Sequence, residues 1–367
     1  MIHAEVSILT VAGGVLLLVG VLWDTFETMV LSRRVSRGTR LTTLFYRLTW
    51  PTWRRAAGRF RAGVKRENFL TTFGPLSLLV LIALWALGLV LAFGLLQWGA
   101  GARMTSPDGS ETFLTTLYMS GTTLFTLGLG DVTPHSAIGR LLTVVESGIG
   151  LGFLALVISY LPVLSQAFSG REANITLLDA RAGSPPTAAE LLRRHGIDRA
   201  ADALVELLGD WEKWSAQLLE SHVSFPVLAF YRSQHDNQSW VAAMTALLDT
   251  CALVLATADQ REKRLVRQAR LTFAMARHAV ADMCRVLGRQ PAPPKPERLQ
   301  PGEAERLFES LTEAGIMLPT GPEATEKLRE LRGMYEPLIH ALGSFLLMPL
   351  PPWMTPAPAR ENWLANL

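Results

Sequence analysis

The chain has 367 residues, 49% of them apolar, and a mean hydropathy of +0.23, which is high for a soluble protein. Its two cysteines, Cys251 and Cys284, exclude a disulfide-stabilised secreted scaffold and suit a reducing cytosol. Three apolar runs in the first half approach the roughly 20 residues that span a bilayer. They are Val6–Phe26, Leu76–Trp98 and Leu141–Leu164.

The charged residues of the first half predict the orientation of these runs. Residues Arg33–Arg66 include eleven Lys or Arg and no acid, whereas Gly99–Ala137 carries one Arg and three acids. The positive-inside rule places the basic segment in the cytoplasm and the other segment outside. We therefore predict a multi-pass protein of the cell membrane, with its N-terminus outside and its C-terminal domain cytoplasmic. Because no basic region precedes the first run, residues 1–32 are predicted to be a retained N-terminal transmembrane helix and not a cleaved signal.

The first helix, about Val6–Leu31, contains two acids, Asp24 and Glu27, on one face. Acids at membrane depth are rare and often functional. A span of about 20 residues that starts at Val6 ends near Asp24, however, and this favours a place at the cytoplasmic boundary. There the two acids would meet basic side chains or lipid headgroups.

Residues 33–69 are predicted to be a basic amphipathic segment on the inner membrane surface. Aromatic side chains such as Trp50 and Trp53 are mixed with the basic residues, and Pro51 is expected to break the segment. We expect Arg33–Arg66 to contact anionic lipid headgroups while the aromatic rings lie at the interface.

A second span, Leu70–Trp98, leads through a short polar stretch and an amphipathic segment, Glu111–Phe125, to a hexapeptide with two glycines. The hexapeptide reads Thr126-Leu127-Gly128-Leu129-Gly130-Asp131. A narrow ring of backbone carbonyls can replace the hydration shell of a cation. Aiming successive carbonyls at one axis requires unusual φ and ψ values, which glycine reaches without a Cβ penalty. The alternating glycines fit such a ring.

This order of elements resembles the pore module of potassium channels, whose filter usually reads Thr-Val-Gly-Tyr-Gly-Asp. The resemblance covers about Leu76–Leu164 and implies a pore module over residues 70–168. One loop supplies a quarter of a carbonyl ring, so the resemblance implies a homotetramer. The implied selectivity filter comprises Thr126, Leu127, Gly128, Leu129 and Gly130, with K⁺ bound at the first four of these residues.

Residues that support the filter and residues that gate the pore are expected within this module, Asp131 and Gly150 from the resemblance and the others from their place in the sequence. The expected filter support comprises Thr122, Thr123, Asp131 and Glu146. For Glu146, on the helix after the filter, a structural hydrogen bond to a neighbouring helix is the alternative. The expected hinge and inner gate comprise Gly150, Tyr160, Pro162 and Leu164, and simple packing is the alternative for the residues near the helix end. Gly148 and Gly152, four residues apart, are predicted to pack against another helix.

Leu129 departs from the family pattern, because tyrosine usually stands there and its hydroxyl bonds into the surrounding pore helices. Leucine cannot donate such a bond. The sequence therefore leaves selectivity for K⁺ over Na⁺ open, whereas passage of cations depends less on this residue.

Residues 169–367 have a different character, with nearly balanced charge and apolar residues at helical period. We predict an all-helical cytoplasmic domain, with a stiff linker at Pro291–Pro296 and a proline-rich tail at Pro349–Pro358. Segment Ser221–Trp240 is expected to be where these helices meet the linker from the membrane. The expected helices are Thr187–His195, Ala200–Ser221, Ser239–Arg289 with a break left open, Glu303–Ala314 and Glu323–Phe345.

The second half carries no glycine-rich nucleotide motif and no P-loop, and its histidines His222 and His235 lack a tight metal-ligand spacing. We therefore expect no enzyme, no cofactor beyond transported K⁺, and no nucleic-acid partner. An unidentified cytoplasmic ligand is compatible with a sensing role for this domain.

The predicted fold class is an all-α membrane protein, in which a potassium-channel-like pore module is joined to an extra N-terminal transmembrane helix and an all-helical cytoplasmic domain. The predicted function is a tetrameric, potassium-permeable cation channel that the cytoplasmic domain gates at the inner helix. Two alternatives stay open: a weakly selective cation channel, and a non-conducting membrane-anchored signalling or scaffold protein.

Overall fold

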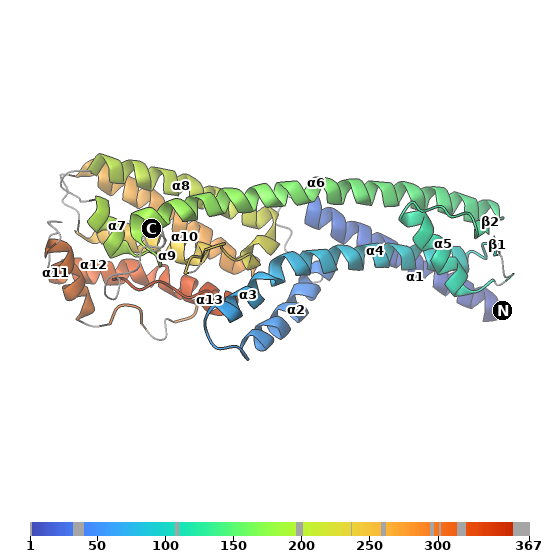
Figure 1. The fold of residues 1–367 in the computed structure, drawn as a ribbon, viewed down its shortest axis with the longest axis horizontal. Helices are drawn as coiled ribbons and strands as arrows, with labels where there is room; N and C mark the ends of the chain where they lie inside the picture. The colour runs from blue at the N-terminus through green and yellow to red at the C-terminus, as the bar shows by residue number, and fades with distance from the viewer. Residues whose placement is uncertain are drawn as a thin grey trace. The chain divides into compact units, whose positions relative to one another are not determined.

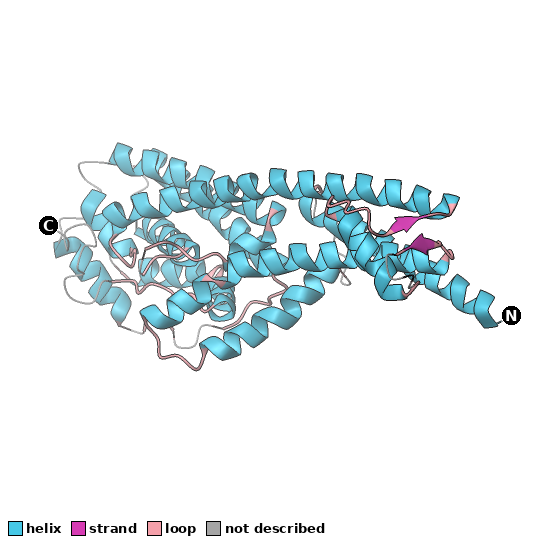
Figure 2. Cartoon of the chain, turned by 45° about the vertical axis from the view of Figure 1, so that its right-hand side comes forward, coloured by secondary structure: helices cyan, strands magenta, loops and turns pink. Residues whose placement is uncertain are grey.

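The computed structural model describes residues 2–31, 40–106, 109, 111–195, 201–235, 237–257, 262–293, 297–300, 302–313 and 321–354. The chain divides into two compact units (Figure 1). The first comprises residues 1–61 and 68–165, and the second comprises residues 62–67 and 166–367. Helices make up most of both units (Figure 2), so the prediction of a helical fold is confirmed.

The first unit is built on two long helices packed against each other, α1 (Ile2–Met29) and α4 (Phe73–Gly99). Helix α4 contains no charged residue, and it also packs against the short helix α5 (Phe113–Leu124). Helix α6 (Ala137–Ala182) follows, and its residues up to 165 belong to this unit. The buried core of the unit includes Val21, Leu81, Trp85, Leu89 and Leu124.

Four helical stretches among the described residues are long and apolar enough to cross a membrane. They are Ser7–Met29, Val64–Gly99, Ala137–Ala182 and Trp240–Thr257, and their most apolar windows are 22%, 50%, 11% and 89% buried, respectively. A spanning helix presents apolar side chains to lipid. The burial of the fourth stretch, α9 (Trp240–Thr257), therefore identifies it as a core helix of the second unit. The other three overlap the three predicted spans.

Two short strands, which the sequence did not predict, close the loop around α5. Strands β1 (Met104–Thr105) and β2 (Thr133–Pro134) pair antiparallel, one before α5 and the other after the hexapeptide. At the start of α5, the hydroxyl of Thr112 accepts a hydrogen bond from the backbone N–H of Thr115. This cap starts the helix at Phe113, slightly later than predicted.

Helix α2 (Leu41–Ala57) runs through Pro51, so the predicted break at this proline is wrong. Trp50 is buried, and its ring centroid lies 4.9 Å from that of Phe73 at the start of α4. This packing stabilises the helix next to the proline and gives the ring a protein partner in place of the expected membrane interface. A short helix, α3 (Val64–Thr71), leads from this segment into α4.

Asp24 and Glu27, near the end of α1, are buried and paired inside the chain. Asp24 accepts hydrogen bonds from the indole of Trp85 at 2.8 Å and from the hydroxyl of Thr42 at 2.7 Å. It also accepts from the backbone N–H of Thr42, at the positive end of the α2 dipole. Glu27 pairs with Arg40 at 3.0 Å. Glu27 thus meets a basic side chain, as expected, whereas Asp24 bonds to Trp85 and Thr42 instead. Residues 33–39 of the basic segment lie outside the described part.

The second unit is organised around α9, whose residues are almost all buried. Helices α7 (Ala188–His195), α10 (Lys263–Val286), α12 (Pro322–Gly333) and α13 (Glu336–Leu346) pack against it. Helix α8 (Ala201–Ser224) packs on α10 and continues into a 3-10 turn, η1 (Pro226–Phe230). Helix α11 (Glu303–Glu313) packs on α7.

Two predicted helices of this unit are divided in the structure. Ser239–Arg289 separates into α9 and α10, on either side of residues 258–261, which the structure does not describe. Glu323–Phe345 separates into α12 and α13. Pro337, at the start of α13, lacks the backbone N–H that a continuous helix would use, which explains this second break. Parts of the predicted linker and tail, residues 294–296 and 355–367, also lie outside the described residues.

Candidate functional site

The backbone of the hexapeptide alternates between two conformations. Thr126, Gly128 and Gly130 have positive φ values of 58°, 55° and 77°, and the two leucines between them do not. When left-handed and right-handed backbone conformations alternate, successive carbonyls point toward the same side. A ring of cation-binding oxygens requires this arrangement. A Cβ at either glycine would meet nothing within 4 Å. The left-handed backbone, and not crowding, is therefore what favours glycine here.

Helix α5 holds the N–H side of this segment. The N–H of Thr126 donates to the carbonyl of Thr123 at 3.0 Å, and those of Leu127 and Gly128 donate to the carbonyl of Thr122 at 2.8 and 3.2 Å. These acceptors are the carbonyls that a helix C-terminus leaves unpaired. Among the described residues, none donates a hydrogen bond to a carbonyl of residues 126–130. The oxygens of this segment are thus available to a ligand.

A second contact joins α5 to the outer end of the hexapeptide. The hydroxyl of Tyr118 donates to a carboxylate oxygen of Asp131 at 2.9 Å. Sequence reasoning proposed Asp131 as a support residue but missed Tyr118. A tyrosine on the helix before the hexapeptide was the available signal, since the hydroxyl of a tyrosine at a half-exposed position usually has a polar partner.

Glu146 of α6 is fully buried and bonds to two other helices. The side-chain amide of Gln97, in α4, donates to one carboxyl oxygen at 3.0 Å. The other carboxyl oxygen is hydrogen-bonded to the hydroxyl of Ser120 in α5, which also lies 2.8 Å from the carbonyl of Val90. Sequence reasoning singled out Glu146 and missed both partners. The cluster joins α5 to the two flanking helices, as the alternative of a structural hydrogen bond to a neighbouring helix expected. The filter-support role of Glu146 stays a prediction.

The glycines of α6 differ in their surroundings within the chain. A Cβ at Gly150 would overlap the carbonyl of Leu124 at the end of α5, whereas a Cβ at Gly148 or Gly152 would meet nothing within 4 Å. Gly150 is therefore the glycine that packs within the chain, and the predicted packing pair faces open space in the single subunit. The hinge role of Gly150 stays a prediction.

The predicted inner gate lies further along α6, which continues as a helix through Pro162. Tyr160 and Leu164 are buried in the single chain, while Pro162 is exposed. A side chain that lines a pore between subunits is exposed in the isolated subunit. The burial of Tyr160 and Leu164 therefore lends no support to their gate role, which stays a prediction.

The surface around the hexapeptide is apolar and uncovered in the single chain. Leu127 and Leu129 are each 63% exposed, and Phe125 before them is 56% exposed. Helix α6 adds a row of exposed apolar residues, which includes Leu141, Val144, Leu151, Leu154 and Ile158. A continuous apolar surface of this kind marks contact with another chain or with lipid.

Residues 78–164 match the protein-family model described as an ion channel. This segment is a potassium-channel-like pore module. The pore module starts within α4, includes α5 and the hexapeptide, and ends in α6 at Leu164. The resemblance inferred over Leu76–Leu164 is thereby confirmed.

The chain also resembles an uncharacterized membrane protein, YdjJ, of Bacillus subtilis (strain 168). The two are 27% identical over 196 residues, which cover 48% of this chain and 52% of the relative. The chain thus spans about half the length of the curated relative it matches. No solved structure matches the chain.

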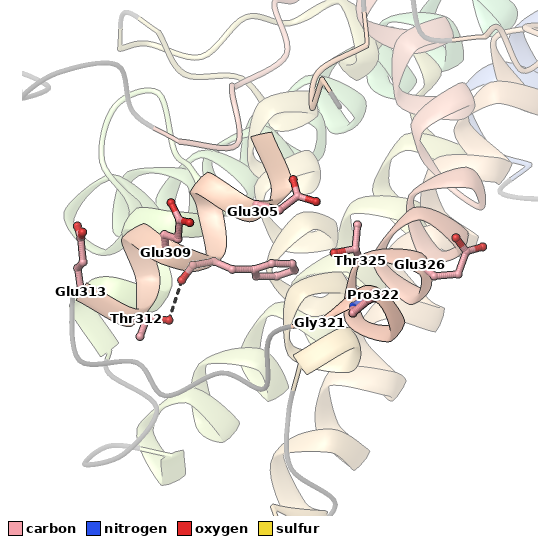
Figure 3. Close-up of a pocket in the computed structure, with 9 residues that line it drawn as sticks. Glu305, Glu309, Thr312, Glu313, Gly321, Pro322, Thr325 and Glu326 are labelled. Carbon is pink, nitrogen blue, oxygen red and sulfur yellow. Dashed lines mark hydrogen bonds between the residues drawn. The ribbon is translucent and has the colours of Figure 1, made fainter. Parts of the chain in front are cut away.

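A cavity of about 880 Å³ lies in the second unit, between α11 and α12. Four glutamates and Phe308 are among its lining residues (Figure 3). Their carboxylates are spread along the two helices and do not converge on one point. In the part of the chain that the structure describes, no group of three or more His, Cys, Asp or Glu side chains could hold a metal ion.

Proposed function

We propose that four copies of this chain form a cation channel through which potassium passes. The alternating backbone of residues 126–130 carries this proposal, because the N–H groups of residues 126–128 bond to α5 while the carbonyls of residues 126–130 have no donor among the described residues. Four such segments around one axis would complete rings of oxygens, with K⁺ bound from Thr126 to Leu129. The C-terminal end of α5, which carries the negative end of the helix dipole, would also favour a cation.

The exposed leucines of the filter segment support the tetramer. A filter that met lipid or bulk water through Leu127 and Leu129 would have no fixed width. In a closed ring, these side chains would pack behind the filter against the neighbouring subunit. The open faces of Gly148 and Gly152 would likewise allow close approach of a second helix.

The charge distribution supports a topology with the N-terminus outside and the second unit in the cytoplasm. On α2, the apolar side chains of Leu44 and Leu48 are exposed beside the exposed Arg47 and Arg54. This combination suits a helix that lies at the inner membrane surface in contact with anionic headgroups.

Hydrogen bonds within the second unit suggest how it would act on the pore. Arg171, on the last part of α6, is buried and donates to the carbonyls of Leu228 and Tyr231, at 2.9 and 3.0 Å. Arg232, which follows Tyr231, forms an ion pair at 3.2 Å with Glu67 of α3, the short helix that leads to α4. The turn after α8 thus holds the chain segments connected to both spans of the pore module. We propose that movement of this turn gates the channel at α6, which fits the expected role of Ser221–Trp240.

Ion flux into liposomes that contain the purified full chain tests the proposal. We expect wild type to conduct K⁺, and Gly128→Ala to reduce flux about tenfold or more, since left-handed strain of about 1–2 kcal/mol per subunit would displace the carbonyls. Gly101→Ala is the matched control, because Gly101 also has positive φ (64°) and open space around it but lies outside the filter. Equal flux from wild type and Gly128→Ala would contradict the filter assignment.

Leu129 specifically favours a second candidate, a weakly selective cation channel, because it offers no hydroxyl to brace the filter. Reversal potentials in mixed K⁺ and Na⁺ separate the two: a value near the K⁺ equilibrium potential supports a selective pore, and a value near zero supports the weakly selective one. No flux of either ion, from the full chain and from a chain that ends at Gly170, would favour the non-conducting anchor.

A further inference from the structure

Helix α10 presents a row of arginines that have no partner among the residues that the structure describes. The helix contains six basic residues and one acid, and its apolar side is buried in the second unit. Arg267, Arg270 and Arg277 are exposed. Their spacing of three and seven residues places them on one side of the helix, over about 15 Å. Within the described residues, none of the three forms an ion pair or a side-chain hydrogen bond. We call these three residues the arginine row.

Helix α11 presents an acidic row of similar length. It contains four acids and one base. Glu305, Glu309 and Glu313 are exposed and follow one another at intervals of four residues, over about 12 Å of one helix face. Among the described side chains, no base pairs with any of them. We call these three residues the glutamate row. They line the cavity between α11 and α12 (Figure 3), which has room for long side chains.

The two rows are on helices that pack on different neighbours. Helix α10 packs on α8, α9 and α13, whereas α11 packs on α7. Among the described residues, no arginine of one row pairs with a glutamate of the other, so the rows do not neutralise each other within one chain. Two separate complementary surfaces on a subunit are what a head-to-tail contact requires, and a head-to-tail contact with the right rotation closes into a ring.

We propose that the second units of neighbouring chains dock head to tail, with the arginine row of one copy against the glutamate row of the next. This inference rests on the proposed homotetramer and assigns the surfaces through which its cytoplasmic parts meet. Guanidinium groups suit this role, because each can form two parallel bonds to a carboxylate. Four contacts would close a ring around the pore axis. As the charges are exposed, the ring should loosen at high salt and thus make the gating assembly sensitive to ionic strength.

A pair of cysteines in the full-length chain tests this contact. The variant Arg270→Cys/Glu309→Cys places one thiol at the centre of each row, while the native Cys251 and Cys284 are buried. A short bis-maleimide should link this variant into dimers, trimers and tetramers. Each single variant alone should give no links, and a mixture of the two single variants should stop at dimers. Links formed as readily by one single variant alone would mean a symmetric contact and would overturn the proposal.

Charge reversal in the same cysteine background provides an independent test. Arg267→Glu/Arg277→Glu should abolish the links, and adding Glu305→Arg/Glu313→Arg should restore them. Lys213→Glu, which changes an exposed lysine on α8, is the control and should leave the links unchanged.

If the native mass shows a tetramer and the cysteine pair still does not link, this inference fails and the channel proposal stands. A monomeric mass would overturn both. Reversal that lowers binding to anionic vesicles but leaves the links unchanged would assign the arginine row to the membrane and overturn the proposal.

Discussion

The hydroxyl of Tyr118 lies 2.9 Å from a carboxylate oxygen of Asp131, and this bond joins α5 to the last residue of the hexapeptide. The other bonds from α5 to the hexapeptide, through Thr122 and Thr123, hold residues 126–128. The hexapeptide is therefore held at both ends, although no described residue bonds to Leu129.

Tyr118→Phe removes this bond while it keeps the ring. A hydrogen bond to a charged acceptor contributes about 1.5–3 kcal/mol when shielded from water, and less at this exposed site. We expect the filter to become less rigid, with K⁺ over Na⁺ selectivity reduced severalfold and the fold unchanged. Reversal potentials and thermal unfolding measure the two effects. Unchanged selectivity would show that Asp131 is held by other means.

Gly150→Ala should destabilise the pore module, because the added methyl would overlap the carbonyl of Leu124. Overpacking of this kind costs about 1–3 kcal/mol. Gly20→Ala, in α1, is the matched control, since nothing lies within 4 Å of its Cβ position. There we expect no loss, or a gain of up to about 1 kcal/mol from helix propensity. Thermal unfolding in detergent compares them, and equal stability of the two variants would contradict the packing role of Gly150.

Glu146→Gln should be tolerated, whereas Glu146→Leu should not. Glutamine keeps an oxygen for the amide of Gln97 and offers a donor to Ser120, whose own proton can reach the carbonyl of Val90. Leucine leaves the buried amide of Gln97 without its acceptor, at about 1–3 kcal/mol, and removes one of the two partners of the Ser120 hydroxyl. Melting temperature and tetramer yield are the measurements. An equal loss of melting temperature and tetramer yield in both variants would indicate that the charge of the carboxylate itself is required.

We expect the stability of the second unit to depend on pH through the protonation of His222. Burial, with the adjacent Arg171 guanidinium, lowers the pKa of His222 to about 3. Its Nδ1 lies 2.8 Å from the carbonyl of Leu218, and its Nε2 lies 3.4 Å from Arg171. The unfolded chain binds the proton with a pKa near 6.5. Stability is therefore complete above about pH 6.5 and falls toward pH 3, by up to about 1.4 kcal/mol per pH unit.

The melting temperature between pH 7.5 and pH 5 measures this effect. His222→Gln should flatten the decline below pH 6.5, and His235→Gln, at an exposed position, should leave it as in wild type. A decline of the same slope in all three proteins would show that other groups cause it.

The predicted elements that depend on local pattern agree with the structure. The apolar runs correspond to α1, α4 and α6, and the glycines of the hexapeptide adopt the left-handed backbone that their spacing indicated. The prediction at Pro51 was wrong because tertiary packing outweighed a local preference of the backbone. Pro51 alone predicts a break, but α2 is held across it by the burial of Trp50 against Phe73.

The sequence by itself determined the three apolar spans, the loop that carries the filter motif and the helical second half, because hydropathy, charge and glycine spacing act over short stretches of chain. Only the tertiary structure decided that Gly150 packs on Leu124, that Tyr118 bonds to Asp131 and that Gln97 reaches Glu146. Gln97 and Glu146 are 49 residues apart in the chain. Such contacts depend on how whole helices pack against each other, and this packing is not encoded in the periodicity of any one helix.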